Sequence, residues 1–208
     1  ALVSLARAGT PIGVLIKRYL AFRYNAAVEH YTISIIRGRG IDHVAMEYIL
    51  KRHRPAHIQF VDGWTGKGAI QNELNQAMRE YPGVEPGLAV LSDPGLLAGK
   101  RGTHDDFLIA SSCLNATVSG LLSRTFYRKD IICPGEFHGA AFYRELMDED
   151  LTYSFIDAVE RRFPLEGGCP EGAPDASASA GEEIAGLCAR FGIGDRNLVK
   201  PGIGAAPR

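Results

Sequence analysis

Residues 58–70 hold the densest group of chemically useful side chains in this chain. An apolar run ends at Asp62, and a turn containing Thr65, Gly66 and Gly68 then leads into helix-forming sequence. Backbone N–H groups, a hydroxyl and a helix N-terminus at one turn are donors suited to a small anion. The pattern predicts a site for a phosphorylated sugar, with the Asp62 carboxylate accepting hydrogen bonds from the ribose hydroxyls.

The predicted site is a continuous set of seven residues that act together. They are Asp62, Gly63, Trp64, Thr65, Gly66, Lys67 and Gly68. The set contains neither G-x-x-x-x-G-K-[ST] nor G-x-G-x-x-G, so it matches neither of these nucleotide-binding motifs. A glycine-rich turn without a ligand is the alternative, and the flanking Asp62 and Thr65 favour the site.

A second anion-binding turn is predicted after the apolar run at residues 2–6. It consists of Arg7, Ala8, Gly9 and Thr10. A glycine lets the backbone approach an anion, and an arginine adds a permanent positive charge. Thr10 followed by a proline also predicts the start of a helix. The alternative is a plain strand-to-helix turn with a surface arginine. Because it accompanies the site at 62–68, we interpret this turn as a pyrophosphate site.

A third turn places Arg37 and Arg39 next to Gly38 and Gly40, after a β-branched run at residues 30–36. Glycines between arginines suit a loop that closes over phosphates. Its alternative is a solvated turn. We predict that Arg37 and Arg39 act in catalysis together with Asp62.

Alternating strands and helices would position these turns. Strands are expected at residues 2–6, 30–36, 57–61, 87–91 and 107–110, with helices at 10–20, 42–53 and 69–79. Such alternation predicts an α/β fold, a parallel sheet with helices on both faces in three layers. Ligands bind such sheets at the carboxyl ends of the strands, where all three turns fall.

The remaining sequence predicts a second region. Residues 1–126 are expected to form the α/β core, and residues 127–208 an irregular, α-rich extension with a flexible linker at 167–181. A strand is expected at 123–126 and helices at 148–163 and 182–191. Because residue 1 already precedes a core strand, we expect the core to be truncated at its N-terminus.

Composition limits the classes of function. The 208 residues carry a net charge of −1, with 46% hydrophobic and 23% charged residues. No apolar run reaches the roughly 20 residues of a membrane span, and no global field attracts nucleic acid. The four cysteines lack a C-x-x-C pair, which argues against thiolate zinc and for a reducing, cytoplasmic location.

Two cysteine-containing segments allow other interpretations. Cys113 lies near a predicted helix N-terminus, where a thiolate is stabilised, and His104 or His138 could act as its base. A small buried cysteine is the simpler explanation. In residues 133–139, Glu136 and His138 could line an acceptor pocket, or Pro134 could simply shape a turn.

Residues 5–11, 37–40 and 61–68 resemble the pyrophosphate, hood and ribose 5-phosphate loops of type I phosphoribosyltransferases. Gly63 stands where that family has a second acid. Residues 5–11, 34–42, 60–68 and 113–125 more closely resemble the phosphoribosyltransferase-like proteins of bacterial tellurium-resistance gene clusters, also catalogued as the cysteine protease StiP family. That likeness extends from residue 1 to about residue 204.

The resemblance implies a phosphoribosyltransferase-like (Rossmann-like) core and transfer from phosphoribosyl pyrophosphate to a small base-like acceptor. Mg²⁺ would be bound through the diphosphate of the substrate. The expected partner is a phosphosugar or nucleotide, with no membrane and no RNA for this segment, and a homodimer stays open. Two alternatives are a cysteine peptidase using Cys113 and a non-catalytic nucleotide or phosphosugar sensor.

Overall fold

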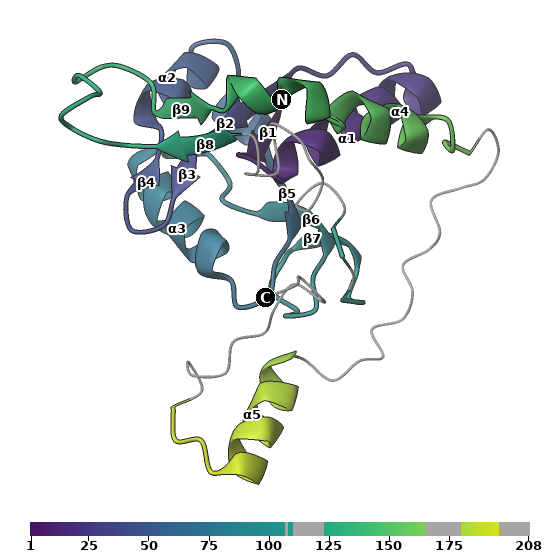
Figure 1. Ribbon diagram of the computed structural model, residues 1–208, viewed down its shortest axis with the longest axis vertical. Helices are drawn as coiled ribbons and strands as arrows, with labels where there is room; N and C mark the ends of the chain where they lie inside the picture. The colour runs from purple at the N-terminus through teal and green to yellow at the C-terminus, as the bar shows by residue number, and fades with distance from the viewer. Residues whose placement is uncertain (107, 110–122, 165–179, 196–208) are drawn as a thin grey trace.

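The computed structural model of the protein describes residues 1–106, 108–109, 123–164 and 180–195. Figure 1 shows an α/β core with helices on both faces of a twisted sheet. Cys113, half of the predicted strand at 107–110 and nearly all of the predicted linker at 167–181 lie outside the described residues.

The sheet confirms the predicted parallel α/β architecture. Its five strands run in the order β2-β1-β5-β6-β7, and all neighbouring pairs are parallel. Their bounds are β1 (Leu2–Leu5), β2 (His30–Ile33), β5 (Gln59–Trp64), β6 (Leu88–Ser92) and β7 (Lys100–Thr103). This is a doubly wound order, and it reverses direction between β1 and β5, where ligands of such sheets commonly bind.

Helices cover the two faces of the sheet, as alternation along the strands requires. Val3 and Phe60 belong to the larger core, which also contains residues of α2 (His43–Leu50) and α3 (Ala69–Ala77). Leu2 and Val61, one position away, pack with Ile12 of α1 (Gly9–Tyr24) on the other face. Short 3-10 turns, η1 (Pro55–His57) and η2 (Met78–Glu80), follow α2 and α3.

The region after the sheet contains a hairpin as well as helices. It consists of β8 (Ser123–Phe126), β9 (Gly139–Phe142), η4 (Arg144–Glu149), α4 (Thr152–Glu160) and α5 (Ala180–Phe191). β8 and β9 pair antiparallel, outside the main sheet. Arg18 of α1 contacts Asp157 of α4 at 3.1 Å, and α4 lies along α1 (Figure 1). The domain boundary after residue 126 falls between these paired strands and stays a prediction.

Several predicted elements need correction. The strand expected at 30–36 divides at Ser34, because β3 (Ile35–Ile36) leaves the sheet to pair antiparallel with β4 (Gly40–Ile41). Helix α1 begins at Gly9 rather than Thr10, and β5 continues through Trp64 instead of ending before Asp62. The fifth strand is Lys100–Thr103, a mostly exposed edge strand without an apolar pattern to reveal it.

Candidate active site

The turn after β1 and the end of β5 lie together, as the sequence predicted. A Cβ on Gly9 would come within 2.7 Å of the Val61 carbonyl oxygen and 3.2 Å of Asp62 Oδ1. Thr10 lies inside α1 and its hydroxyl is 3.2 Å from the Thr32 hydroxyl. Gly9 therefore packs directly against Asp62 at the reversal point of the sheet.

The turn at 62–68 is covered by neighbouring groups. The Thr65 N–H donates to the Ser92 carbonyl at 3.0 Å, and the Trp64 ring lies over Gly66. A Cβ on Gly95 would come within 2.0 Å of the Gly66 carbonyl oxygen, so the loop after β6 is in contact with this turn. Anion binding at these residues stays a prediction.

Asp62 has an unusual environment. It is partly buried, and its Oδ1 accepts the Gly63 N–H at 2.8 Å. Burial raises the pKa of Asp62 from 3.8 to about 7, against the smaller opposing effect of that hydrogen bond. The carboxyl group therefore keeps its proton in the folded state at pH values where the unfolded chain has lost it.

Replacing Asp62 with Asn is expected to raise the free energy of unfolding at pH 8 by roughly 1–3 kcal/mol, since one pKa unit is worth about 1.4 kcal/mol. Between about pH 4 and 7 the folded state binds more protons than the unfolded state, so the wild-type stability falls as pH rises. The gain should vanish near pH 4. Urea unfolding from pH 4 to 8 measures it, with exposed Asp106→Asn as the control. A gain that does not change with pH would contradict this assignment.

The third predicted turn forms the short β3–β4 hairpin. Gly38 and Gly40 have φ values of +69° and +83°, which glycine adopts readily. The Gly38 N–H donates to Glu73 of α3 at 2.9 Å. Arg37 and Arg39 are exposed. Arg39 lines a cavity, and the described residues that line it include neither Arg7 nor Asp62. The structure thus brings two of the three predicted turns together and places the third beside a different site.

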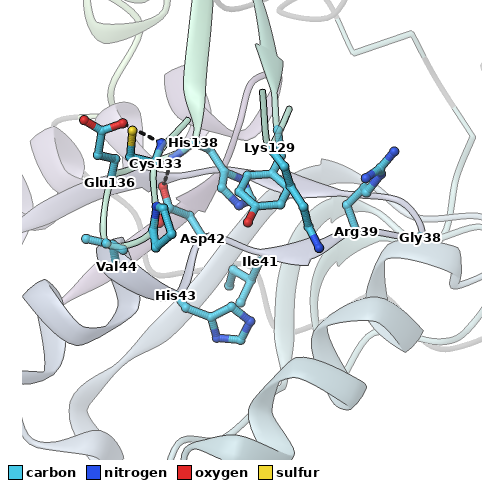
Figure 2. Close-up of a pocket in the computed structure, with 13 residues that line it drawn as sticks. Gly38, Arg39, Ile41, Asp42, His43, Val44, Lys129, Cys133, Glu136 and His138 are labelled. Carbon is cyan, nitrogen blue, oxygen red and sulfur yellow. Dashed lines mark hydrogen bonds between the residues drawn. The ribbon is translucent and has the colours of Figure 1, made fainter. Parts of the chain in front are cut away.

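That cavity has a volume of about 490 Å³ and lies between the hairpin, the start of α2 and residues 127–138 (Figure 2). It is lined by polar and ionisable side chains from segments far apart in sequence. They are Arg39, Asp42, His43, Tyr127, Lys129, Cys133, Glu136 and His138. An exposed thiol and an imidazole therefore line the same hollow, which we call the thiol cavity.

The sequence Cys-Pro-Gly-Glu fixes the backbone at Cys133. Pro134 and Gly135, with φ of +88° at the glycine, suit the two central positions of a type II turn. The Glu136 N–H donates to the Cys133 carbonyl at 3.1 Å, and the Cys133 N–H donates to the Glu136 carboxylate at 2.8 Å. Cys133 is a free, exposed cysteine on a turn closed at both ends.

His138 is held from two sides. Its backbone N–H donates to Asp42 Oδ2 at 2.7 Å, and its Nδ1 lies 3.0 Å from the Ser34 hydroxyl. Asp42 also caps α2 by accepting the Ala45 N–H at 3.0 Å. The Tyr127 ring lies 4.9 Å from the imidazole, centre to centre. Asp42 therefore positions the main chain of His138, while Ser34 contacts its ring.

The charge state of His138 suits a base. Burial lowers its pKa, and the Asp42 carboxylate opposes this with a smaller effect. The imidazole is therefore neutral at pH 7 and can accept a proton. Lys129 and Arg39 bring positive charge to the same cavity, where a developing oxyanion would be stabilised. The described residues contain no group of three or more His, Cys, Asp or Glu that could hold a metal ion.

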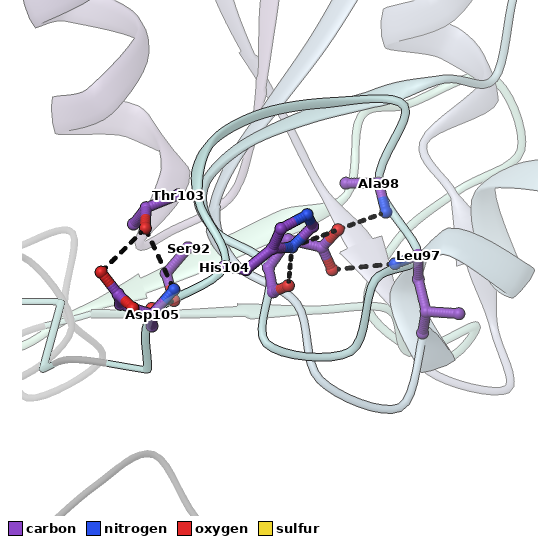
Figure 3. A network of polar contacts seen from close by, with 7 residues as sticks. Ser92, Leu97, Ala98, Thr103, His104 and Asp105 are labelled. Carbon is purple, nitrogen blue, oxygen red and sulfur yellow. Dashed lines mark hydrogen bonds and ion pairs between the residues drawn. The ribbon is translucent and has the colours of Figure 1, made fainter. Parts of the chain in front are cut away.

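A second histidine lies at the carboxyl edge of the sheet. His104 Nδ1 donates to the Asp93 carbonyl at 2.7 Å, and the Asp93 carboxylate accepts the N–H groups of Leu97 and Ala98 (Figure 3). This bond fixes the tautomer, with the lone pair on Nε2. The expected partner of His104 was Cys113, whose segment lies outside the described residues.

Comparison with known proteins identifies one group of relatives. A family model described as "Tellurite-like stress resistance cysteine protease StiP" matches residues 1–160. The curated "Cysteine protease StiP" of Acinetobacter baylyi (strain ATCC 33305 / BD413 / ADP1) is similar to this chain, with 36% identity over 224 residues. The match covers 100% of this chain and 58% of that protein. No solved structure matches.

These findings overturn the predicted activity. Phosphoribosyl transfer was wrong as the main interpretation, since both the family and the curated relative are cysteine proteases. The StiP part of the resemblance is confirmed, and a relation to phosphoribosyltransferases is not shown. The alternative of a cysteine peptidase is the one that the comparisons support.

Two further expectations have different outcomes. No helix in the described part of the chain is long and apolar enough to cross a membrane. Mg²⁺ binding through the diphosphate of a phosphoribosyl substrate stays a prediction. For residues 133–139 the sequence left an acceptor pocket and a structural turn as alternatives, and it did not indicate Cys133 as reactive. The Cys-Pro-Gly-Glu turn five residues before His138 was the available signal.

Proposed function

Because the chain belongs to the family of StiP tellurite-like stress resistance cysteine proteases, we propose that it cleaves peptide bonds with a cysteine thiolate. The chain spans 58% of the length of its curated relative. That the activity named for the longer protein is also that of this chain is therefore part of the proposal. The observation that carries it at residue level is the thiol cavity, whose lining includes both Cys133 and His138.

The family match narrows the choice of nucleophile. Of the four cysteines, only Cys113 and Cys133 fall within residues 1–160. Cys113 is the nucleophile that the sequence indicated, and its surroundings are not described. Cys133 is exposed in a cavity together with a neutral histidine, which is the pairing that activates a thiol. We therefore assign the nucleophile to Cys133 and use Cys113 as the competing assignment in the tests.

The reaction follows from these groups. His138 takes the proton of the Cys133 thiol on Nε2, while Nδ1 faces the Ser34 hydroxyl. The Cys133 sulfur attacks the scissile carbonyl carbon, and the C–N bond breaks as the imidazolium gives its proton to the leaving amine. Water then attacks the thioester, with its proton passing to the imidazole. The C–S bond breaks, releasing a carboxylic acid and restoring the thiol.

Glu136 limits which groups can stabilise the oxyanion. Its carboxylate already accepts the Cys133 N–H, so that backbone donor is occupied. Lys129 and Arg39 are the cations that line the cavity. We assign the stabilisation of the tetrahedral oxyanion to these side chains, and the positioning of Cys133 to Glu136.

Alkylation of the protein with iodoacetamide during digestion of denatured casein tests this proposal. We expect casein cleavage to stop in proportion to modification of a single thiol, mapped by mass spectrometry to Cys133. Casein that stays intact with the unmodified protein would contradict peptidase activity. Loss of cleavage that follows modification of Cys113 would keep the peptidase and overturn the assignment of its nucleophile.

A further inference from the structure

A second cavity adjoins the thiol cavity and shares His138 and Asp42 with it. It has a volume of about 380 Å³, within the range of small-ligand sites. Its apolar lining comes from β2, α2 and the segment around β9. The main contributors are Tyr31, Ala45, Tyr48, Ile49, Phe137 and Ala140. His138 thus lies between the polar thiol cavity and an apolar cavity whose described lining residues include no cysteine.

Aromatic rings at this apolar cavity are exposed yet ordered by their neighbours. Phe137 is 54% and Tyr48 is 42% exposed. Tyr48 meets Tyr31 and Phe137 edge to face, with ring centres 6.3 and 6.5 Å apart. The Arg52 guanidinium lies 3.6 Å from the Tyr48 ring centre. Exposed aromatics fixed in place beside a cavity mark a binding surface more than a gap in packing.

The wall of the apolar cavity also selects by charge. Asp42 lies on the shared wall, and its carboxylate is buried. An acidic substrate side chain placed there would meet a like charge and lose its water. An aromatic or large aliphatic side chain would instead remove its own surface and that of Tyr48 and Phe137 from water.

We infer that the apolar cavity binds an aromatic or large aliphatic side chain of the peptide substrate, next to the bond that is cleaved. This inference rests on the proposed function, since the shared His138 is what places that side chain beside the scissile bond. The protein would thus be a peptidase that selects apolar residues at its cleavage site.

Two variants on one strand test the inference. Ala140 lines the apolar cavity, whereas Ala141 follows it on β9 and its side chain points to the opposite face. Fluorogenic peptides would differ only in Phe, Ala or Asp beside the scissile bond. We expect Phe peptides to be cleaved with the highest kcat/KM. Ala140→Leu should lower that value at least about tenfold, and the matched Ala141→Leu should leave it unchanged.

A binding measurement separates this inference from the proposed function. N-acetylphenylalaninamide should slow alkylation of Cys133 in the parent and in Ala141→Leu, but not in Ala140→Leu. Cleavage without preference for Phe, or equal behaviour of the two variants, would overturn the apolar pocket and leave the peptidase standing. Protection without cleavage of any peptide would support the pocket and overturn the peptidase.

Discussion

Replacing Cys133 with Ser is expected to lower kcat/KM for peptide hydrolysis by about 10⁴-fold or more, because losing a covalent nucleophile removes the step on which the others depend. The side chain stays nearly the same size, and Cys133 is exposed on a closed turn, so the fold should be unaffected. Steady-state kinetics on a fluorogenic Phe peptide measure the loss, and thermal unfolding checks the fold.

Two further cysteine variants are the controls for this result. Cys188→Ser, on α5 and outside the family match, should retain full activity. Cys113→Ser tests the competing nucleophile and should also retain activity under our assignment. If activity is lost in Cys113→Ser and kept in Cys133→Ser, the nucleophile is Cys113 and our assignment to Cys133 is wrong.

The fold was largely predictable because its signals are local. The apolar runs at β1, β5 and β6 and the helical periodicity between them required a covered parallel sheet. The capping of α2 by Asp42 follows from one residue at one position. β7 was missed because its sequence, Lys-Arg-Gly-Thr, is that of an exposed edge, and its place in the sheet depends on pairing with β6.

The site was less predictable because it is assembled from distant parts of the chain. Ser34 and His138 are 104 positions apart, and Asp42 and His138 are 96 apart. No spacing rule reveals such contacts. The glycine-rich turn at 62–68 gave a strong local signal, but in the folded chain Gly66 is covered by a tertiary contact from Gly95 and by the ring of Trp64 in the turn itself. Local chemistry thus favoured the sugar-phosphate interpretation, while the thiol cavity exists only in the folded chain.

Two histidines in the thiol cavity provide an internally controlled test of the base. His138→Gln is expected to lower kcat/KM by about 10² to 10⁴-fold, the usual contribution of a general acid–base group. Glutamine keeps the backbone N–H that binds Asp42, so the turn should hold. His43 lines the same cavity, but its Nδ1 lies 2.7 Å from the Tyr81 hydroxyl. His43→Gln should therefore change kcat/KM little, and equal losses in the two variants would contradict the assignment.

The pH profile separates a base from a merely structural histidine. Burial lowers the pKa of His138 below its ordinary 6.5, so the neutral form persists into mildly acidic solution. Wild-type activity should fall as the pH drops through the lowered pKa of His138, because a protonated imidazole no longer accepts the proton of the thiol. In His138→Gln the residual activity should lose this acid limb, because no imidazole remains there to titrate. An acid limb that survives in the variant at the same pH would assign the base to another group. His104 would then be the candidate, because its hydrogen bond to the Asp93 carbonyl leaves the Nε2 lone pair to accept a proton.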